Sequence, residues 1–346
     1  MSNIVKNRYD VVGVVEAVMC NPNGDPNADN QPRVDYDTNK GIITDVAMKS
    51  RIRAYVANSY AAKPGFDIFM KRGSFLNKAI MEARVNAESL GMDDKVTGTG
   101  SKDVVTTAMV DTAQEDILNR FWDVRTFGGV LSTGVNAGQV RGPVQISFAT
   151  SVNDVEVVMD GLTRGSSSDA KGKNPTTMNE MIQFVNDMGD DKKRTMGHKY
   201  HIPYGLYVVK MTVSGHLAEK CHFTEEDLQI LFEAFIQMYN TDASSSKMGM
   251  SVISPVVVFK HIGVDCGDVE RQENSAKLGC APSYKLFEMV DIKQKDGIEI
   301  PRSYHDFDMK LHMENLPDGV VCGLKTTPFG PIEWLDSTDT IDLETV

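Results

Sequence analysis

The chain has 346 residues, of which 41% are apolar and 24% charged, a composition ordinary for a globular protein of one large domain or two. It contains no apolar run of the roughly 18 residues that cross a bilayer, and MSNIVKNRYD does not resemble a signal peptide, so we expect a cytosolic protein without a membrane partner. The formal net charge of −12 argues against a general nucleic-acid binder.

The first half of the chain predicts a strand, a loop and a helix in close succession. Valine-rich residues 9–19 indicate a buried strand, and NPNGDPNADNQP at 21–32 indicates an ordered loop. Thr44 is a helix cap, and Met48, Ile52 and Val56 recur at helical spacing. Lys49 and Arg53 form a basic row beside that apolar stripe.

Further elements follow in order. Helical patterns occur around 75–87 and at 117–122, and a glycine-punctuated segment spans 125–143. Val144, Ile146 and Phe148 alternate like a strand, and further strands are predicted at 202–213 and 252–262, where Pro255 favours an edge or a bulge. Thr224 caps the clearest helix, 224–240.

This order of strands and helices predicts an α+β fold of ferredoxin-like type, with helices on one face of a sheet. The connection formed by residues 153–201, 49 residues, is too long for a simple hairpin. Their polar middle and basic end suit either a projection that touches a polyanion or a mobile surface loop, and the sequence leaves both open.

Charge is unevenly distributed along the chain. Residues 299–346 carry ten acids and three bases, a net of −7, which leaves −5 for the rest. Two short stretches are locally basic and keep RNA binding open. Their members are Lys49, Arg51 and Arg53, and Lys192, Lys193, Arg194, His198, Lys199 and His201.

Tests for metal and catalytic motifs are negative, so we expect no metal and no cofactor. Five widely spaced cysteines form no CxxC, and His261, Cys266 and Cys280 are better interpreted as loop residues than as ligands. The loop from Asp25 fails as an EF-hand, and no GK[ST], GxSxG or HExxH motif occurs. The aromatic RRM signature is also missing, so RNA binding would use loops and a helix edge.

Four segments together resemble the backbone subunit of CRISPR Cascade, the seventh Cas family. The first is NPNGDPNADNQPRVDYDTNKGIITDVAMKSRIRAYV at 21–56. The second, DVRTFGGVLSTGVNAGQVRGPVQISFA at 123–149, points to subtype I-C. RTMGHKYHIPYGLYV at 194–208 and APSYKLFEMV at 281–290 agree with that subtype. With helix 224–240, the resemblance extends over most of residues 8–290.

The resemblance implies a single domain, an RRM-like palm with a finger insertion at about 60–111, a thumb-like insertion at 153–201 and an acidic tail at 299–346. Copies would stack along the spacer of the crRNA, kink it and leave short runs free to pair with a target DNA strand. The other partners implied are the crRNA-processing cap subunit, the large and small subunits of Cascade, and a recruited helicase-nuclease. Because that nuclease does the cutting, the chain itself is expected not to be an enzyme.

Carried onto this sequence, the resemblance assigns RNA contacts to basic positions of the first helix, to the loop after the first strand, to the glycine segment and to the base of the thumb. These positions are Asn21, Asn23, Gly24, Asp25, Arg33, Lys49, Arg51, Arg53, Arg125, Gln139, Arg141, Met196, Lys199, His201 and Tyr204.

Some positions depart from the family pattern. Ser50 and His198 stand where a basic residue is expected, residues 240–250 lack arginines, and 262–280 is an insertion.

Two rival hypotheses stay open. One is a type III-like subunit that cleaves target RNA with Asp25, Asp29 or Asp35, and the other is a protein scaffold that binds no RNA.

Overall fold

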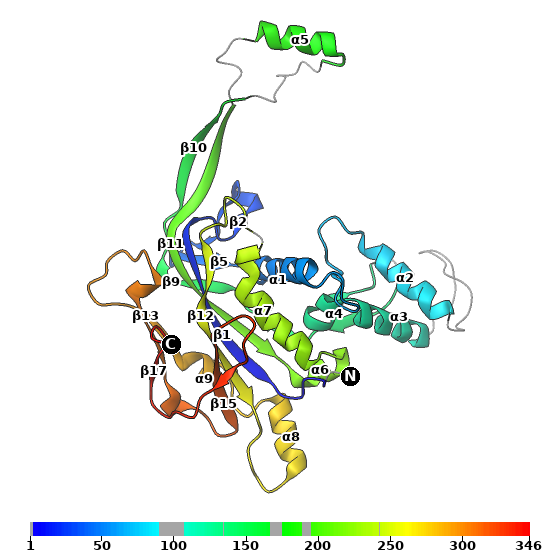
Figure 1. The fold of residues 1–346 in the computed structure, drawn as a ribbon, viewed down its shortest axis with the longest axis vertical. Helices are drawn as coiled ribbons and strands as arrows, with labels where there is room; N and C mark the ends of the chain where they lie inside the picture. Colours follow the sequence, from blue (N-terminus) through cyan, green and yellow to red (C-terminus); the bar gives the residue numbers. More distant parts are fainter. Residues whose placement is uncertain (1–2, 90–106, 134, 167–174, 189–194, 242) are drawn as a thin grey trace.

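One large antiparallel sheet organises the molecule (Figure 1). The computed structural model describes residues 3–89, 107–133, 135–166, 175–188, 195–241 and 243–346. Strand β1 (Tyr9–Cys20) lies between β11 (Thr195–Val213) and β12 (Met250–His261). The valine-rich run at 9–19 is therefore a buried central strand, as predicted.

The sheet continues on both sides of these three strands. Beyond β11 lie β8 (Val144–Ile146) and β9 (Ala149–Asp154), then β5 (Lys40–Ile43) and β4 (Val34–Asp35); beyond β12 lie β15 (Val320–Lys325) and β16 (Glu333–Trp334). The predicted alternation of buried and exposed residues ends after Ile146, because β8 ends there and β9 begins only at Ala149. Phe148, between the two strands, is exposed. β15 pairs with β12 only from Val256 onward, so at Pro255 the strand has an edge on that side, and the register shift opposite Val12 and Val14 is the predicted bulge.

Two helices cover one face of the sheet. In α1 (Asp45–Ser59), the Thr44 side chain accepts a hydrogen bond from the N–H of Ala47, and Met48, Ile52 and Val56 are buried. In α7 (Glu225–Thr241), the N–H of Asp227 donates to Thr224 Oγ1 at 3.1 Å, while the N–H of Thr224 donates to Asp227 Oδ2 at 2.9 Å. Both helices were predicted from these caps and stripes.

The opposite face of the sheet is covered by the C-terminal part of the chain. It is built from α9 (Ser283–Glu288), β13 (Val290–Gln294), β14 (Phe307–Leu311), β17 (Ile341–Asp342) and the turns η3 (Tyr304–Asp306) and η4 (Met313–Asn315). Phe307 and Leu311 are buried against Val12, Leu206 and Leu324 of the main sheet. The acidic segment 299–346 is therefore folded against the sheet, and the sheet is covered on both faces.

A helical side unit packs beside α1. It consists of α2 (Leu76–Ser89), α3 (Thr107–Arg120) and α4 (Trp122–Phe127), with Ile80, Ile117 and Leu118 in a small core of its own. A single helix was predicted at 117–122, but two helices meet there: α3 ends at Arg120, and Phe121 is extended and caps α4, which begins at Trp122. The short strands β6 (Gly128–Val130) and β7 (Gln139–Arg141) form a hairpin after α4.

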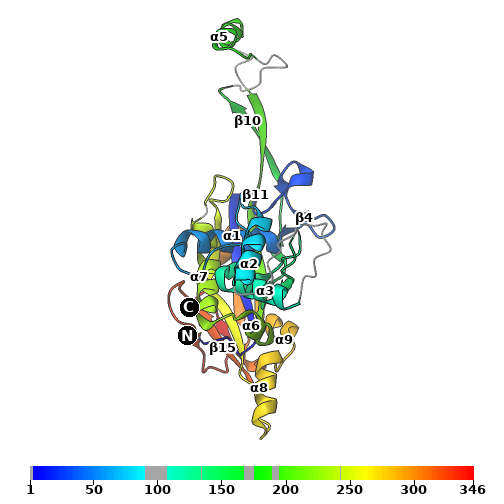
Figure 2. The same ribbon diagram turned by 90° about the vertical axis from the view of Figure 1, so that its right-hand side faces the viewer.

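The segment 153–201 contains a projecting arm (Figures 1 and 2). Strand β10 (Val158–Arg164) pairs with the first part of β11 from Val158↔His201 to Arg164↔Thr195. Helix α5 (Met178–Asp187) lies at the far end of this arm, away from the sheet. The projection that the sequence left open is thus a β-hairpin tipped by a helix.

The remaining connections are short. The loop after β1 contains β2 (Gly24–Asp25), the turn η1 (Pro26–Ala28) and β3 (Gln31–Pro32). Helix α6 (Gly215–Cys221) follows β11, and α8 (Val269–Leu278) occupies the insertion at 262–280. Within the described residues, no helix is both long and apolar enough to cross a membrane.

Candidate nucleic-acid interface

The loop after β1 is fixed to the start of α1. Asn23 Oδ1 accepts hydrogen bonds of 2.9 Å from both the backbone N–H and the hydroxyl of Thr44, the helix cap. The amide of Asn21, which is buried, donates to the backbone carbonyl of Asn30 at 2.7 Å. At Gly24 a Cβ would lie 2.9 Å from the backbone carbonyl oxygen of Asn30, so a larger residue would require the turn to shift. The loop therefore presents one defined shape beside the helix.

Lys247 holds this loop from the other side. Its ammonium donates to the backbone carbonyl of Asn21 at 2.6 Å and also to that of Pro22. Burial, and then the positive charge of Arg51, lowers the pKa of Lys247 to about 8. This role of Lys247 has no signal in the sequence, because a single lysine in the polar segment 240–250 forms no periodic pattern.

The base of the arm contacts the same loop. The Lys199 ammonium donates to the carbonyl of Ser245 at 3.3 Å, and the Tyr200 hydroxyl donates to Asp29 at 3.4 Å. His201 is buried, with Nδ1 2.9 Å from a carboxylate oxygen of Asp160, whereas Met196 is 80% exposed. Three segments thus meet at one place, which we call the arm-base cluster: the two predicted segments 21–33 and 196–201, and residues 243–250.

The carboxylates of the loop accept hydrogen bonds from nearby residues of the loop itself. Asp25 accepts from the N–H of Asn27 and from Arg33 Nη1 at 3.1 Å, while Nε of Arg33 is buried without a hydrogen-bond partner. The Thr38 hydroxyl, followed by the N–H of Asp37, lowers the pKa of Asp35. No cluster of metal-ligating side chains occurs in the part of the chain that the structure describes.

The basic row of α1 faces the helical side unit. Lys49 Nζ lies 2.9 Å from Asp45 and 5.7 Å from the centroid of Phe127. Arg53 Nε donates at 2.9 Å to Asp123, which is buried, and its guanidinium lies 5.1 Å from the same ring. Arg53 therefore has a structural role at the α1–α4 contact. Arg51, between them, is partly buried.

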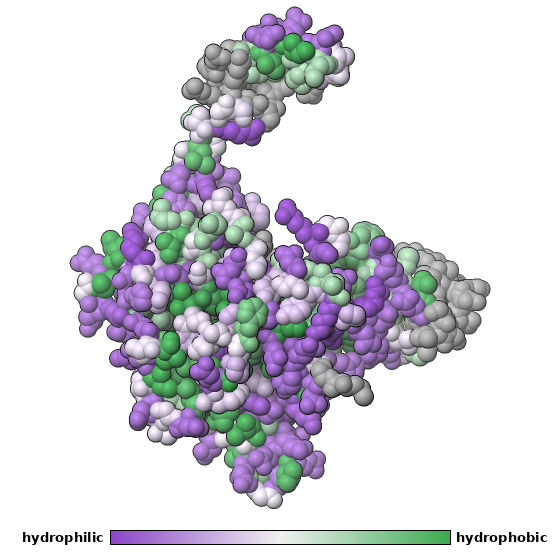
Figure 3. Space-filling model, viewed as in Figure 1, coloured by the Kyte–Doolittle hydropathy of each residue, from purple (hydrophilic) through white to green (hydrophobic). Residues whose placement is uncertain are grey.

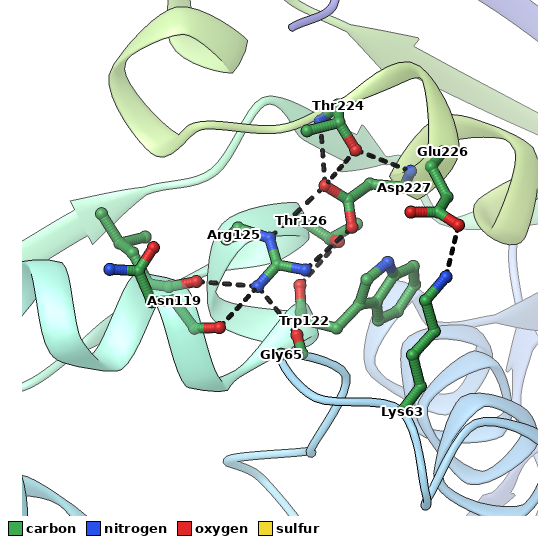
Figure 4. A network of polar contacts seen from close by, with 10 residues as sticks. Lys63, Gly65, Asn119, Trp122, Arg125, Thr126, Thr224, Glu226 and Asp227 are labelled. Atoms are coloured by element: carbon green, nitrogen blue, oxygen red, sulfur yellow. Dashed lines mark hydrogen bonds and ion pairs between the residues drawn. The ribbon is translucent and has the colours of Figure 1, made fainter. Parts of the chain in front are cut away.

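Arg125, which was expected to line the RNA groove, has its guanidinium bonded within its own chain (Figure 4). Its guanidinium is 7% exposed and bonds Asp227 through Nη2 at 2.9 Å. Its Nη1 donates to the carbonyls of Gly65 at 2.9 Å and Leu118 at 2.8 Å. Because these groups fill its donor sites, Arg125 joins α4 to α7 instead of meeting a phosphate.

Tyr204, which was also predicted to contact RNA, is buried as well. It is 2% exposed, stacks on Phe307 with ring centroids 6.2 Å apart, and donates to Glu16 at 3.1 Å. Burial and the neighbouring Glu16 carboxylate raise its pKa. The residue lies on the sheet face that the C-terminal part covers, because side chains alternate along β11 and Tyr204 points away from α1 and α7.

The glycines of the segment 125–143 let two parts of the backbone approach closely. A Cβ on Gly142 would lie 2.3 Å from the nitrogen of Gly128, and Gly128 has φ +82°. Gln139 and Arg141 are exposed on β7, with their carbonyls bonded to Gln114 of α3 and Cys221 of α6. The three residues of the 192–201 basic stretch that precede Thr195 lie outside the described residues.

Comparison with known proteins identifies the family. The family model of "CRISPR-associated protein Cas7" matches residues 7–312, which is most of the chain. The chain belongs to the Cas7 family. A Cas7 protein of Haloferax volcanii is 29% identical over 262 residues, covering 70% of this chain and 67% of its own length.

Two solved chains are similar at 14% identity. One, from a "CRISPR RNA-guided surveillance complex", has a TM-score of 0.46 and covers 95% of both chains. The other, from such a complex described as "pre-nicking", has a TM-score of 0.42 and covers 73% of this chain and 78% of its own. Cas7 backbone subunits of type I Cascade bind crRNA and are non-catalytic.

Proposed function

We propose that this chain is the backbone subunit of a type I-C Cascade, in which several copies follow the spacer of one crRNA, kink it and present it to the target DNA strand. Its sheet and the helices α1 and α7 would be an RRM-like palm, because β12-β1-β11-β8 is the strand order of a ferredoxin-like fold. The arm would be the thumb, and α2 and α3 the finger. The other partners would be the cap, large and small subunits of Cascade and the recruited helicase-nuclease.

The observation that carries this proposal is the arm-base cluster within a Cas7 chain. Residues 21–33, 196–201 and 243–250 are far apart in sequence but are joined by Lys247, Lys199 and Tyr200. The projecting arm and the fixed loop would hold one strand between them, with few cations per copy and many copies per strand. Lys49 beside Phe127, and Arg141 on β7, supply further positive charge toward the finger.

RNA that copurifies with the protein tests the proposal. We expect the triple variant Lys49→Gln, Arg141→Gln and Lys199→Gln to lose most of the crRNA that the wild type retains, measured by absorbance and by extraction. Arg53 is excluded from this variant, because removing it would leave the buried Asp123 carboxylate without its cation.

A matched control removes the same charge elsewhere. Arg271 and Lys277 lie on α8, at the end of the molecule opposite the arm (Figure 1), and Lys293 lies on β13. Their triple Gln variant should retain the RNA. Equal RNA content in both variants and the wild type would refute the assignment, and regular cleavage of complementary RNA with Mg²⁺ would favour the aspartate-dependent alternative.

A further inference from the structure

A turn between α1 and α2 presents two exposed cations. Residues 63–78 contain four basic residues and one acid, a net charge of +3 in a chain whose total is −12. At their centre, Lys71 and Arg72 are exposed and form no ion pair among the described residues. In Figure 3, hydrophilic side chains project from the surface of the body where Figure 1 places this segment. We call residues 70–75 the basic turn.

The buried carboxylate of Asp123 fixes the base of this turn. Asp123 Oδ1 accepts a hydrogen bond of 2.7 Å from the N–H of Phe69, and Oδ2 accepts one of 3.1 Å from the N–H of Met70. Arg53 Nε donates to the same Oδ2 at 2.9 Å, so the charge of the carboxylate is balanced inside the body. The basic turn therefore starts from a defined position beside α4.

Hydrogen bonds within the turn hold its tip. The N–H of Ser74 donates to the carbonyl of Lys71 at 3.0 Å, and Ser74 Oγ donates to the carbonyl of Phe69 at 3.3 Å. Gly73 has φ +79°, and no described atom lies within 4 Å of the position that a Cβ on it would take. The tip thus has a defined shape and stands clear of the body, which lowers the ordering cost of binding a ligand there.

A groove of about 480 Å³ leads from the end of α1 to the basic turn. Ala57 and Phe66 form part of its apolar lining, and its charged lining consists of Lys63, Asp67, Lys71 and Arg120. Lys63 and Arg120 are paired with acids of α7, α2 and α3. Because Asp67 offsets one cation, attraction for an anion comes from the end of the groove at the basic turn.

The groove and the arm-base cluster lie at different ends of α1. The loop 21–33 is bonded to Thr44, the residue before this helix, whereas the groove reaches the last turns of the helix at Ala57. The 15 residues of α1 extend about 22 Å at 1.5 Å per residue. In Figure 1 the segment between α1 and α2 lies across α1 from β2. The two sites are therefore separate.

Two apolar side chains flank the cations of the basic turn. Phe75 is 73% exposed and Met70 is 52% exposed. Cations beside an exposed aromatic ring suit a single strand, because phosphates meet the cations and unpaired bases stack on the ring. When a guide pairs with one strand of a DNA duplex, the bases of the other strand lose their partners. That strand therefore has the free bases that such a surface binds.

We propose that the basic turn binds the DNA strand that is displaced when the guide pairs with its target. Lys71 and Arg72 neutralise phosphates of that strand, and Phe75 stacks on one of its bases. Because each copy of the chain presents one such turn, several copies hold the strand at intervals and slow its return to the target strand. The inference rests on the proposed function, since a strand is displaced only where crRNA pairs with double-stranded DNA.

Reconstituted complexes loaded with crRNA test the contact on two DNA substrates. The double variant Lys71→Gln, Arg72→Gln should bind a DNA duplex that contains the target at least about tenfold more weakly than the wild type, because each copy loses two phosphate contacts. Its affinity for the complementary single strand alone should not change, since pairing with that strand displaces nothing. Fluorescence anisotropy of labelled DNA measures both affinities, and the retained crRNA should equal that of the wild type.

A matched control removes the same charge elsewhere. The double variant Arg271→Gln, Lys293→Gln alters exposed residues of α8 and β13 and should bind both substrates like the wild type. Unchanged duplex affinity in the Lys71→Gln, Arg72→Gln variant would overturn the proposal. Equal losses on duplex and single strand would assign the turn to the target strand, and loss of crRNA would assign it to the guide, so either result overturns it too. A wild type that retains no crRNA would instead refute the proposed function.

Photo-cross-linking identifies the strand. With 5-iododeoxyuridine in the displaced strand, ultraviolet light should cross-link the DNA to the chain, and mass spectrometry should locate the product at Phe75. The same nucleotide in the target strand should give no such product. Phe75→Leu should lose the cross-link, whereas Phe329→Leu should keep it, because Phe329 is 76% exposed but lies between β15 and β16. A cross-link from the target strand alone, or one that persists in Phe75→Leu, would contradict the proposal.

Discussion

Single residues that look like RNA ligands in the sequence can be structural in the fold, and Arg125 is the clearest case. Arg125→Met would leave the Asp227 carboxylate buried without its cation, so we expect a loss of about 3–5 kcal/mol in the free energy of unfolding by urea. Arg120→Met is the matched control, because its pairs with Asp116 and Glu82 are about one-third exposed and worth under about 1 kcal/mol. Equal losses in the two variants would contradict the structural role, and at low temperature folded Arg125→Met should still retain crRNA.

Lys247 makes a second prediction, on pH dependence. Its pKa is lowered from 10.5 to about 8 in the folded chain, so between these values the unfolded chain binds a proton that the folded chain has released. Stability therefore rises with pH across this window, and the penalty of charging Lys247 is greatest below pH 8. The free energy of unfolding of the wild type minus that of Lys247→Met should therefore increase by about 1–3 kcal/mol from pH 8 to pH 10.5.

The comparison with Lys247→Arg separates titration from packing. An arginine stays charged throughout this range, so the difference between Lys247→Met and Lys247→Arg should stay constant with pH. A wild-type excess that is flat between pH 8 and 10.5, in urea unfolding at fixed ionic strength, would show that the ammonium is not desolvated by the loop.

At the scale of elements, the turn after α4 depends on two glycines. Gly128→Ala and Gly142→Ala should each cost about 1–3 kcal/mol in urea unfolding, because Gly128 has φ +82° and a Cβ on Gly142 would meet backbone atoms at 2.3 Å. Gly129→Ala is the control: its Cβ would meet only Leu131 at an ordinary 3.6 Å. If all three variants unfold alike, the close approach of α4 to β7 is not what requires these glycines.

The elements that the sequence predicted are those with a local signal. Strand β1 and helices α1 and α7 have continuous apolar patterns and caps that lie within a few residues of them. Strand β10 was missed because nearly all of its residues are exposed, which leaves no alternation to detect. Strands β14 and β15 were missed because the composition of 299–346 is acidic, although buried residues of β14 pack on the large sheet and β15 is one of its strands.

The candidate site was predictable to a similar extent. The loop at 21–32 and the base of the arm could be found because their motifs are long and ordered. The partner of Arg125 is 102 residues away and the carbonyls that Lys247 binds are 225 and 226 residues away, so neither role has a local pattern. Burial of these groups is a property of the folded chain.

At the scale of the whole molecule, the net charge of −12 must be reconciled with RNA binding. The most acidic segment, 299–346, folds largely against the sheet face opposite α1 and α7. A sheet and the layer packed on it lie about 10 Å apart, and salt screens the interaction of solvent-exposed charges over about 8 Å at physiological ionic strength. The acids on the covered face therefore weaken phosphate binding little on the α1 side.

This separation predicts how the affinity depends on salt. Each cation that neutralises a single-stranded phosphate adds about −0.7 to the slope of log affinity against log salt concentration. Arg141→Gln should therefore make the slope for a labelled single-stranded RNA shallower by about 0.7, measured by fluorescence anisotropy over a KCl series. Arg271→Gln removes the same charge on α8 and should lower the affinity slightly at low salt without changing the slope. If both variants shift the slope equally, binding responds to net charge and not to a local track of cations, and Arg141 has no direct phosphate contact.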